Sequence, residues 1–435
     1  MAGSSSTPET SMGLSLSAGT LGRGAAARSE RVRVPMTLLQ LGQSLSTRSM
    51  EELEQTYRKL TPPRLRSIFS AHPEVAELSC LRSCHRVEVY AVIRDGSAGE
   101  RLRRSLPGPL GRWELRKGSD AAHHLFRVAA GLESMAVGEH EVRHQVAEAA
   151  RTTLSRHGRP LLRSMMDASV RSAGTSATPG DRDPPSIAAL VVRKLLDRAP
   201  QPSTRVLVLG TGTVGRKVAD LLRGKAHVTL AYHRRAPDPA VLEHLGCLAV
   251  RFADVPKELR HTEVLIAAAK GGEYAIRTSD LPRAPRGPLR LIFDLGLPRN
   301  VDPSLANDPR VELFDLAGLR SEAPTPPGPT PADRAARVAS DLAFRLYLSG
   351  AWEPVLSELW RKAERIRQEE LEGALLHAPE LSSQEREVLS KLTERLVRRL
   401  LSGPTARLRT LTEGDLKPEV VAAVLALFDE ADVAP

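Results

Sequence analysis

The sequence predicts an α/β protein with an N-terminal α/β domain, a Rossmann-type nucleotide-binding domain and a C-terminal all-helical domain. Three observations support this prediction. The chain has 435 residues, more than a single core accommodates. An apolar strand leads into the glycine loop Gly210–Gly215, and a helical pattern follows the proline-rich segment 321–332. The expected boundaries are a disordered tail at 1–34 and domains at 35–180, 181–320 and 321–435.

The N-terminal tail is rich in Ser, Gly, Ala and Thr and lacks apolar periodicity, so it is predicted to be disordered. Its arginines amid serines are typical of an organelle transit peptide, whereas Glu9 and Glu30 argue against one. Two interpretations are favoured: a tail without function, or a start site placed too early, with translation beginning at Met36.

The first domain is predicted from short segments of contrasting pattern. Met36–Gly42 is an apolar run of strand length, and Met50–Arg58 is polar and helical in character. Arg86–Ile93 alternates as a strand does, and residues 121–170 carry apolar residues at helical spacing. A mixed α/β domain therefore begins near residue 35.

The second domain is predicted to be a doubly wound parallel sheet. Thr175–Pro185 has the composition of a linker, and Ser186 can cap the helix that follows it. Apolar strands separated by helical segments then indicate parallel β-α-β units. The expected strands are Arg205–Leu209, Val228–Tyr232, Val264–Ala268 and Leu291–Leu295.

The glycine loop is predicted to bind a dinucleotide. Gly210 allows the tight turn, Gly212 lets the backbone approach the pyrophosphate, and Gly215 lets helix and strand pack closely. The helix N-terminus then faces the phosphates. The intervening residues expected to contact the cofactor are Thr211, Thr213 and Val214.

The residues after the second strand indicate which dinucleotide binds. An acidic residue is expected there for NAD, but the chain has His233-Arg234-Arg235. Arg234 and Arg235 are suited to a 2′-phosphate, so NADPH is favoured over NADH. The alternative is that both arginines are merely solvated.

The C-terminal domain is predicted from apolar stripes at helical spacing. Ser382 and Glu385 form a capping box ahead of one such helix. Stripes of this kind are not buried by one helix alone, so they pack on the same chain or form a dimer, which we favour. The stripes are Val338, Leu342 and Leu346; Val355, Leu359, Ala363 and Ile366; and Val388, Leu392, Leu396 and Leu400.

Composition narrows the class of protein. No apolar run of 18 residues occurs, so no membrane span is expected. Three cysteines cannot form a disulfide framework and favour a reducing compartment, so we expect a cytoplasmic protein. The net charge of +10 either aids solubility or attracts a polyanionic partner. Glu139, His140, Glu141 and His144 do not complete a metal-site pattern, and no metal is expected.

Cys84 is the candidate nucleophile. Arg82, His85 and Arg86 surround it in the sequence and would supply the positive potential that activates a thiol. The alternative is a small core residue, which is the commoner role of a lone cysteine. A positioned thiol together with a reduced nicotinamide is the minimum needed to reduce an activated carboxyl group through a thioester.

With these residues assembled, the chain resembles the glutamyl-tRNA reductase family over residues 36–410. Leu81-Arg-Ser-Cys-His-Arg-Val-Glu-Val-Tyr90 resembles the family signature Leu-Ser-Thr-Cys-Asn-Arg-x-Glu-x-Tyr. His124–Glu139 is similar to the longer second signature, and Gln145 is in register with it. Asp294–Pro303 and Leu392–Pro404 follow in the family's order.

The resemblance implies a reaction, a cofactor and partners. Cys84 would attack the aminoacyl ester of glutamyl-tRNA(Glu), and NADPH would reduce the resulting thioester to glutamate-1-semialdehyde, the first step of five-carbon tetrapyrrole biosynthesis. The domain at 35–180 would be catalytic, and 321–435 would join a homodimer. The aminomutase that consumes the semialdehyde is an implied partner.

The resemblance also implies site residues. Arg86 would hold the substrate carboxylate, and His124 would assist in acid–base chemistry. The remaining expected contacts to substrate are Ser83, His85, Ser134, Glu139, His140, Glu141 and Gln145.

Departures from the family pattern leave alternatives open. His85 stands where the family has Asn, and His140 and Glu141 stand where it has Pro and Gln. Arg171–Gly174 lacks two cations of the family's sequence. One alternative is a diverged, non-catalytic paralogue that binds tRNA, haem or a pathway partner. Another is an oxidoreductase of the shikimate dehydrogenase type, disfavoured because it leaves Cys84 and the helical tail unexplained.

Overall fold

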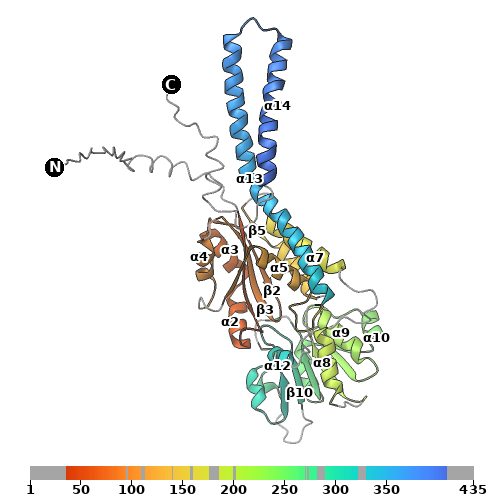
Figure 1. Cartoon of the computed structure of the whole chain (residues 1–435). Helices are drawn as coiled ribbons and strands as arrows, with labels where there is room; N and C mark the ends of the chain where they lie inside the picture. The colour runs from red at the N-terminus through yellow and green to blue at the C-terminus, as the bar shows by residue number, and fades with distance from the viewer. Residues whose placement is uncertain are drawn as a thin grey trace, which may run out of the picture. The chain divides into compact units, whose positions relative to one another are not determined.

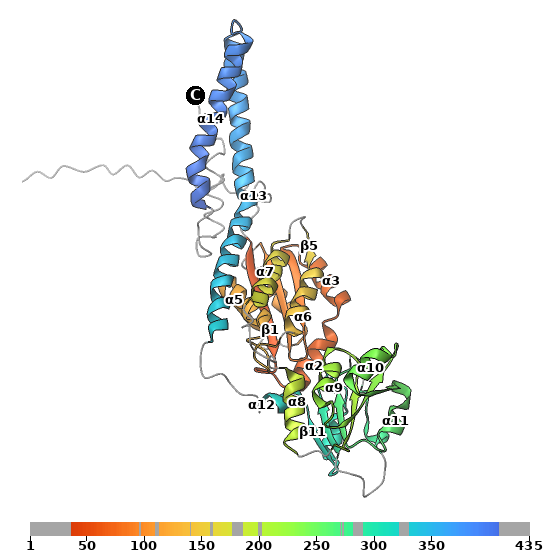
Figure 2. The same ribbon diagram turned by 90° about the vertical axis from the view of Figure 1, so that its right-hand side faces the viewer.

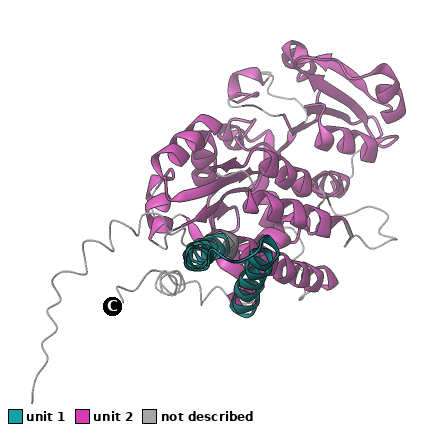
Figure 3. Cartoon of the chain, turned by 90° about the horizontal axis from the view of Figure 1, so that it is seen from above, with its two compact units in different colours: residues 1–35, 354–404, 416–435 teal, residues 36–353, 405–415 magenta. Residues whose placement is uncertain are grey.

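The computed structural model describes most of the chain from residue 36 to residue 408. The described residues are 36–94, 97–108, 113–139, 141–156, 160–175, 186–198, 202–269, 271, 274–281, 290–321 and 330–408. They form two compact units (Figure 3), one comprising the described residues of 36–353 with 405–408 and the other 354–404. The predicted tail, His140 and most of the predicted linker lie outside the described residues.

The first part of the larger unit is a five-stranded sheet in which neighbouring strands are antiparallel. Strand β3 (Arg86–Ile93) lies at its centre and is buried along its whole length. Because side chains alternate across a strand, Val87, Val89 and Ala91 share one face, while Arg86, Glu88 and Tyr90 share the other. The order is β4 (Glu114–Lys117), β1 (Thr37–Ser44), β3, β2 (Val75–Arg82) and β5 (Leu154–Ser155).

Helices cover this sheet. Three of them, α5, α6 and α7, contact one another and strands of the sheet. The start of α7 is fixed by buried Glu77 of β2, whose carboxylate accepts hydrogen bonds from the backbone N–H groups of Leu161 and Leu162, both at 2.8 Å. The helices are α2 (Met50–Lys59), α3 (Pro62–Ala71), α4 (Ala98–Ser105), α5 (Gly118–Ala129), α6 (Glu141–Arg151) and α7 (Leu161–Thr175).

The second part is the predicted doubly wound parallel sheet. Its order is β11-β10-β9-β6-β7-β8 and every pair is parallel. The strand order reverses between β6 and β9, which is where such folds bind ligands. The strands are β6 (Arg205–Leu209), β7 (His227–Tyr232), β8 (Leu248–Arg251), β9 (Val264–Ala267), β10 (Arg290–Asp294) and β11 (Val311–Phe314). The helices are α8 (Ile187–Leu196), α9 (Thr213–Leu222), α10 (Pro239–Leu245), α11 (Val255–Glu258) and α12 (Leu316–Ser321), with short 3₁₀ turns at Phe252–Asp254, Thr278–Asp280 and Pro303–Asn307.

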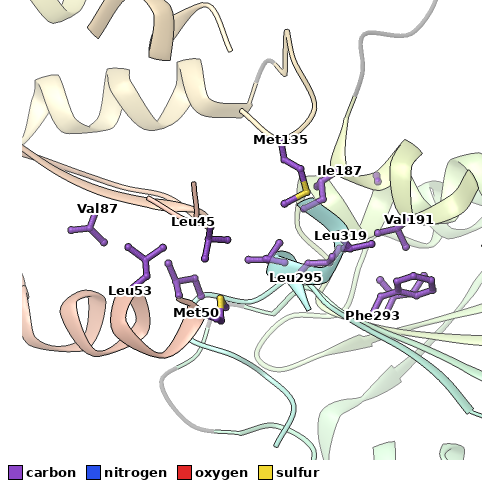
Figure 4. Packing of buried hydrophobic residues seen from close by; sticks show 14 of the residues in the cluster. Leu45, Met50, Leu53, Val87, Met135, Ile187, Val191, Phe293, Leu295 and Leu319 are labelled. Atoms are coloured by element: carbon purple, nitrogen blue, oxygen red, sulfur yellow. The ribbon is translucent and has the colours of Figure 1, made fainter. Parts of the chain in front are cut away.

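The two sheets of this unit share one apolar cluster. Leu45, Met50 and Met135 from the first part belong to the same cluster as Ile187 and Leu295 from the second (Figure 4). A buried ion pair joins the parts as well. Arg299 donates to Glu54 at 3.0 Å and to Glu51 at 2.8 Å, and both carboxylates lie on α2. The shared core and the ion pair hold the sheets in one compact unit.

Helix α13 (Pro331–His377) begins in this unit (Figures 1 and 2). Ala336, Phe344 and Tyr347 are buried, and the Tyr347 hydroxyl donates to the backbone oxygen of Met36 at 2.7 Å. The predicted stripe of Val338, Leu342 and Leu346 instead lies in solvent. Phe344 lies two positions from both Leu342 and Leu346, which is about 200° around an α-helix. The aromatic residues offer more apolar area for packing, so the opposite side of the helix is the buried one.

The smaller unit is a pair of helices, the remainder of α13 and most of α14 (Ser383–Leu408), which run side by side in Figures 1 and 2. The predicted capping box is present, with Glu385 N–H donating to Ser382 Oγ at 3.3 Å and Ser382 N–H donating to the Glu385 carboxylate at 2.9 Å. One apolar stripe is buried, at Val355, Leu359 and Ala363. The α14 stripe is exposed, at Val388, Leu392, Leu396 and Leu400.

Most expected elements are present within a residue or two, including the helix capped by Ser186. Strands β2, β4, β5, β8 and β11 have no counterpart in the prediction. The expected domain boundaries stay a prediction, because residues 36–353 cluster as one unit. Among the described helices, none combines the length and hydropathy needed to span a bilayer.

Candidate active site

Cys84 sits in the turn that joins two central strands. The turn Ser83-Cys84-His85 connects β2 to β3 and is closed by a hydrogen bond from Ser83 N–H to Arg86 O at 3.0 Å. The backbone oxygen of His85 accepts from Leu45 N–H at 3.0 Å. Both strands flanking the turn are interior strands of the sheet, so strand pairing on both sides sets the position of the thiol.

The turn lines a cavity of about 870 Å³ that lies between the two sheets of the larger unit. The predicted site residues on its wall are Ser83, Cys84, His85, Glu139, Glu141 and Gln145. The wall also includes Val214 of the glycine loop and residues 295–297, which follow strand β10. The cavity therefore brings together the candidate thiol and the predicted nucleotide loop, which lie 130 residues apart in the sequence.

A tight loop places Glu139 on the cavity wall. Gly131 has φ +72°, and a Cβ there would lie 2.7 Å from both the backbone nitrogen and oxygen of Glu139, so glycine is needed at this close approach. Burial raises the pKa of the Glu139 carboxyl to about 7, although a hydrogen bond from the backbone of Ile187 acts to lower this pKa. Glu139 is thus able to change its protonation state near neutral pH, beside the thiol.

The surroundings of Cys84 differ from the predicted positive potential. Burial, assisted by Glu139, raises the pKa of the Cys84 thiol to about 12, and Arg86 only partly opposes this rise. Arg82 is engaged elsewhere, with its guanidinium 3.9 Å from the centre of the Tyr57 ring. Burial also lowers the pKa of His85 to about 3. Cys84 is therefore a neutral thiol beside a neutral imidazole, whose Nδ1 lies 3.1 Å from Sγ.

Arg86 and His124 belong to a buried network rather than to the cavity wall. Glu88 Oε1 accepts from Arg86 at 3.3 Å and from His124 Nε2 at 2.9 Å, and Oε2 accepts from the Tyr90 hydroxyl at 2.7 Å. Arg86 also donates to the backbone oxygen of Glu133. These contacts lower the pKa of the Glu88 carboxyl, although burial alone would raise it. The sequence analysis assigned no role to Glu88, although its spacing from Arg86 and Tyr90 puts all three on one face of the strand.

Two predicted residues retain unused hydrogen-bonding capacity. Ser134 is buried, and its Oγ has no partner among the described residues. Arg86 is buried as well, and its Nε has no such partner. Buried polar atoms normally find partners, so both are candidates to bind a ligand. Ser134 is not among the residues on the cavity wall.

The glycine loop has the geometry that a dinucleotide requires. A Cβ on Gly210, which has φ +109°, would lie 2.8 Å from the backbone oxygen of Ala268, and one on Gly215 would lie 2.1 Å from that of Gly210. A Cβ on Gly212 would meet nothing within 4 Å. Gly210 and Gly215 are thus needed for packing, whereas Gly212 leaves open space at the N-terminus of α9, where a pyrophosphate fits.

The predicted 2′-phosphate residues follow strand β7. Arg234 and Arg235 are exposed, and the described residues offer neither of them an ion-pair partner. The neighbouring His233 ring stacks on Phe252, with the ring centres 3.9 Å apart. This edge of the sheet therefore presents two uncompensated guanidinium groups beside the nucleotide loop.

Comparisons with known proteins follow the same division of the chain. Residues 41–178 match the family model for the N-terminal domain of glutamyl-tRNAGlu reductase, and residues 342–430 match the model for its dimerisation domain. The glutamyl-tRNA reductase of Salinispora tropica is 32% identical over 91% of this chain and 92% of that protein. This chain belongs to the glutamyl-tRNA reductase family. The family catalyses the first step of tetrapyrrole biosynthesis.

A second glutamyl-tRNA reductase, a dehydrogenase family model and a solved structure are also similar to this chain. The glutamyl-tRNA reductase of Rubrobacter xylanophilus is 29% identical over 77% of this chain and 83% of that protein. Residues 193–322 match the family model for shikimate / quinate 5-dehydrogenase, which supports a pyridine nucleotide as the cofactor of this oxidoreductase. A solved glutamyl-tRNA reductase from Methanopyrus kandleri is 24% identical, covers 89% of this chain and 98% of its own, and has a TM-score of 0.46.

Proposed function

We propose that this chain reduces glutamyl-tRNA(Glu) to glutamate-1-semialdehyde with NADPH, through a thioester on Cys84. The observation that carries the proposal is the shared cavity, because its wall includes both the Cys84 turn and Val214 of the nucleotide loop. An acyl group on Sγ and a nicotinamide held by the loop would occupy the same space. Membership in the family supports the reaction class.

The first step is acyl transfer. Sγ forms a bond to the glutamyl carbonyl carbon, the ester bond to the ribose breaks, and the tRNA leaves with a free hydroxyl group. A thioester is a better acceptor of hydride than a carboxylate, which explains the covalent detour. Because the pKa of the thiol is about 12, the proton must be taken from sulfur as attack occurs.

The cofactor would be held by the glycine loop and by the arginines after β7. The loop residues are Gly210, Thr211, Gly212, Thr213, Val214 and Gly215, and the N-terminus of α9 would face the pyrophosphate. Arg234 and Arg235 would pair with the 2′-phosphate, which selects NADPH over NADH. When bound, the dihydronicotinamide supplies the hydride that reduces the thioester.

Side chains on the cavity wall would bind the glutamyl group. Ser83 and Gln145 offer neutral hydrogen-bonding groups, and Glu139 and Glu141 offer carboxyl groups suited to the substrate's ammonium. Arg86 is not on this wall, but its Nε, the guanidinium nitrogen without a partner among the described residues, would bind the substrate carboxylate. Ser134 and His124 complete the proposed site, and His140 lies outside the described residues.

Homodimer formation follows from the match to the dimerisation domain. The exposed stripe on α14 offers an apolar face of the kind that a second copy would cover. Light scattering on the full chain measures the oligomeric state directly, and a monomer at micromolar concentration would contradict homodimer formation.

Two further expectations belong to this proposal. The domains would divide at 35–180, 181–320 and 321–435. The aminomutase that uses the semialdehyde would be a partner.

The test of this function is an assay of the purified chain with glutamyl-tRNA(Glu) and NADPH. The expected products are glutamate-1-semialdehyde, free tRNA and NADP. Without NADPH, the wild type should still release tRNA as the thioester forms, and then glutamate as the thioester hydrolyses. Binding of tRNA without release or reduction would favour a non-catalytic paralogue instead.

A further inference from the structure

The side chains of Cys84 and His85, which are adjacent in the turn, are in contact. Sγ lies 3.1 Å from Nδ1, within the distance for a hydrogen bond to sulfur. Both side chains line the cavity. His85 is 2% exposed, so the surrounding protein restricts its ring. The only other ring nitrogen, Nε2, is buried and has no hydrogen-bond partner among the described residues.

We propose that His85 is the acid–base partner of Cys84, taking the thiol proton on Nδ1 during acyl transfer and returning it to the departing ribose. This inference rests on the proposed function. As Sγ bonds to the glutamyl carbonyl carbon, the S–H bond breaks and an N–H bond forms on Nδ1. As the ester C–O bond breaks, the same proton passes to the ribose oxygen, which leaves as a hydroxyl. No electrons are gained or lost in this step.

The charges around the pair determine its resting protonation state. Facing groups are Arg86 and Glu88 on β3, Glu139 after α5, Glu141 at the start of α6, and Arg320 on α12. Burial, Arg86 and Arg320 keep the imidazole neutral at rest and also oppose its protonation, whereas Glu88 favours it, so Nδ1 holds the proton only while attack proceeds. Burial and Glu139 keep the thiol protonated. The resting pair is therefore neutral, and proton transfer accompanies attack rather than preceding it.

His85→Asn is the direct test, because Asn is the family's residue at this position and its amide accepts no proton at neutral pH, so the variant shows whether this chain relies on its histidine. Rapid-mixing measurement of tRNA release from glutamyl-tRNA(Glu) should show about a 10²-fold slower first turnover. The affinity for glutamyl-tRNA should change much less. The control is His227→Asn, because His227 is an exposed histidine at the amino end of β7, away from the cavity wall. An unchanged first turnover in His85→Asn would overturn the proposal.

A second arm requires no tRNA and separates this inference from the proposed function. Alkylation of wild type and His85→Asn by iodoacetamide, followed by peptide mass spectrometry, reports each cysteine separately. Alkylation of Cys84 should slow in the variant. Cys80 is the internal control, because burial raises the pKa of this thiol to about 12 as well and no described histidine is its hydrogen-bond partner. Equal rates at Cys84 in both proteins would overturn the pairing.

The two arms distinguish the possible failures. Slower Cys84 alkylation in the variant, with no tRNA release by the wild type, would contradict the proposed function and leave the pairing in place. His85→Ala guards against a merely structural effect, because added imidazole can enter the cavity that the side chain leaves. Imidazole should restore tRNA release in this variant, rising with the fraction of neutral imidazole. Failure of rescue in a folded His85→Ala protein would contradict a proton-transfer role.

Discussion

His124 and Glu88 form a buried hydrogen bond, with Nε2 of the histidine 2.9 Å from Oε1 of the carboxylate. The same carboxylate holds Arg86, so a single glutamate fixes two residues of the proposed site from beneath the cavity. Arg86 and Glu88 side chains are each 3% exposed, which leaves water little access to either charge. Glu88 is therefore a positioning residue for both.

Replacing Glu88 with Gln should strongly destabilise the fold. The variant leaves the buried Arg86 guanidinium without its anion, which typically raises the free energy of the folded state by about 3–5 kcal/mol. Tyr90→Phe, which removes only the hydroxyl bonded to Glu88 Oε2, should lower stability by about 1 kcal/mol. Chemical denaturation measures both. An equal loss of stability in the two variants would contradict the claim that the Glu88 charge stabilises the buried Arg86.

Two glycine variants should separate packing from cofactor binding. Gly215→Ala places a Cβ 2.1 Å from Gly210 O, so it should destabilise the protein by about 1–3 kcal/mol or more. Gly212→Ala meets open space, so it should change stability by only about 1 kcal/mol, through the helix cap, yet weaken NADPH binding. Thermal unfolding and fluorescence titration report the two effects. Undiminished NADPH affinity in Gly212→Ala would contradict the proposed pyrophosphate position.

Arg234→Ala should weaken NADPH binding more than NADH binding. Losing a charged hydrogen bond to the 2′-phosphate should reduce NADPH affinity by about tenfold or more and leave NADH affinity nearly unchanged. The control is Arg260→Ala, since Arg260 is an exposed arginine just before β9, at the amino edge of the same sheet. An equal loss for both cofactors would remove the 2′-phosphate assignment.

Glu139 should make stability depend on pH. Burial raises the pKa of its carboxyl from about 4.5 to about 7 in the folded state. The folded state thus favours the protonated form, so this contribution is complete below pH 4.5 and is lost as pH rises through 7. The loss is of the order of 3 kcal/mol.

Glu139→Gln stays neutral and should lose that dependence, with Glu141→Gln as the control on the same wall. Chemical denaturation below pH 4.5 and above pH 7 gives the free energy of unfolding at each pH. The difference between the two values should be smaller in Glu139→Gln than in wild type. Asp294, whose pKa burial raises to about 6, changes stability in the same direction in every variant, so it does not affect the comparison. The same pH dependence in wild type and Glu139→Gln would contradict the assignment.

The sequence was most informative where structure depends on neighbouring residues. The apolar run Arg205–Leu209 and the alternating run Arg86–Ile93 were predicted with the bounds observed, because each pattern is local. Strand β2 was missed since it contains Glu77, whose partners Leu161 and Leu162 lie more than 80 residues away. Strand β8 is an edge strand with Leu248 in solvent, so it lacks the apolar signature of a buried strand.

The sequence predicted which residues form the site better than it predicted their protonation states. Six of the proposed substrate and catalytic residues meet on one cavity wall, as the short sequence motifs suggested. The protonation state of Cys84 was not readable from its cationic neighbours, because burial decides it and burial depends on the whole fold. Glu88 was missed because its role depends on His124, which lies 36 residues further along the chain.

The most direct test of the account is mass spectrometry of protein trapped with glutamyl-tRNA(Glu) in the absence of NADPH. The predicted result is a glutamyl adduct on the peptide that contains Cys84, absent from the Cys84→Ser variant, which should also lose reduction and tRNA release. Semialdehyde formation by Cys84→Ser, or a wild-type protein that turns over without any adduct at Cys84, would contradict the proposed Cys84 thioester.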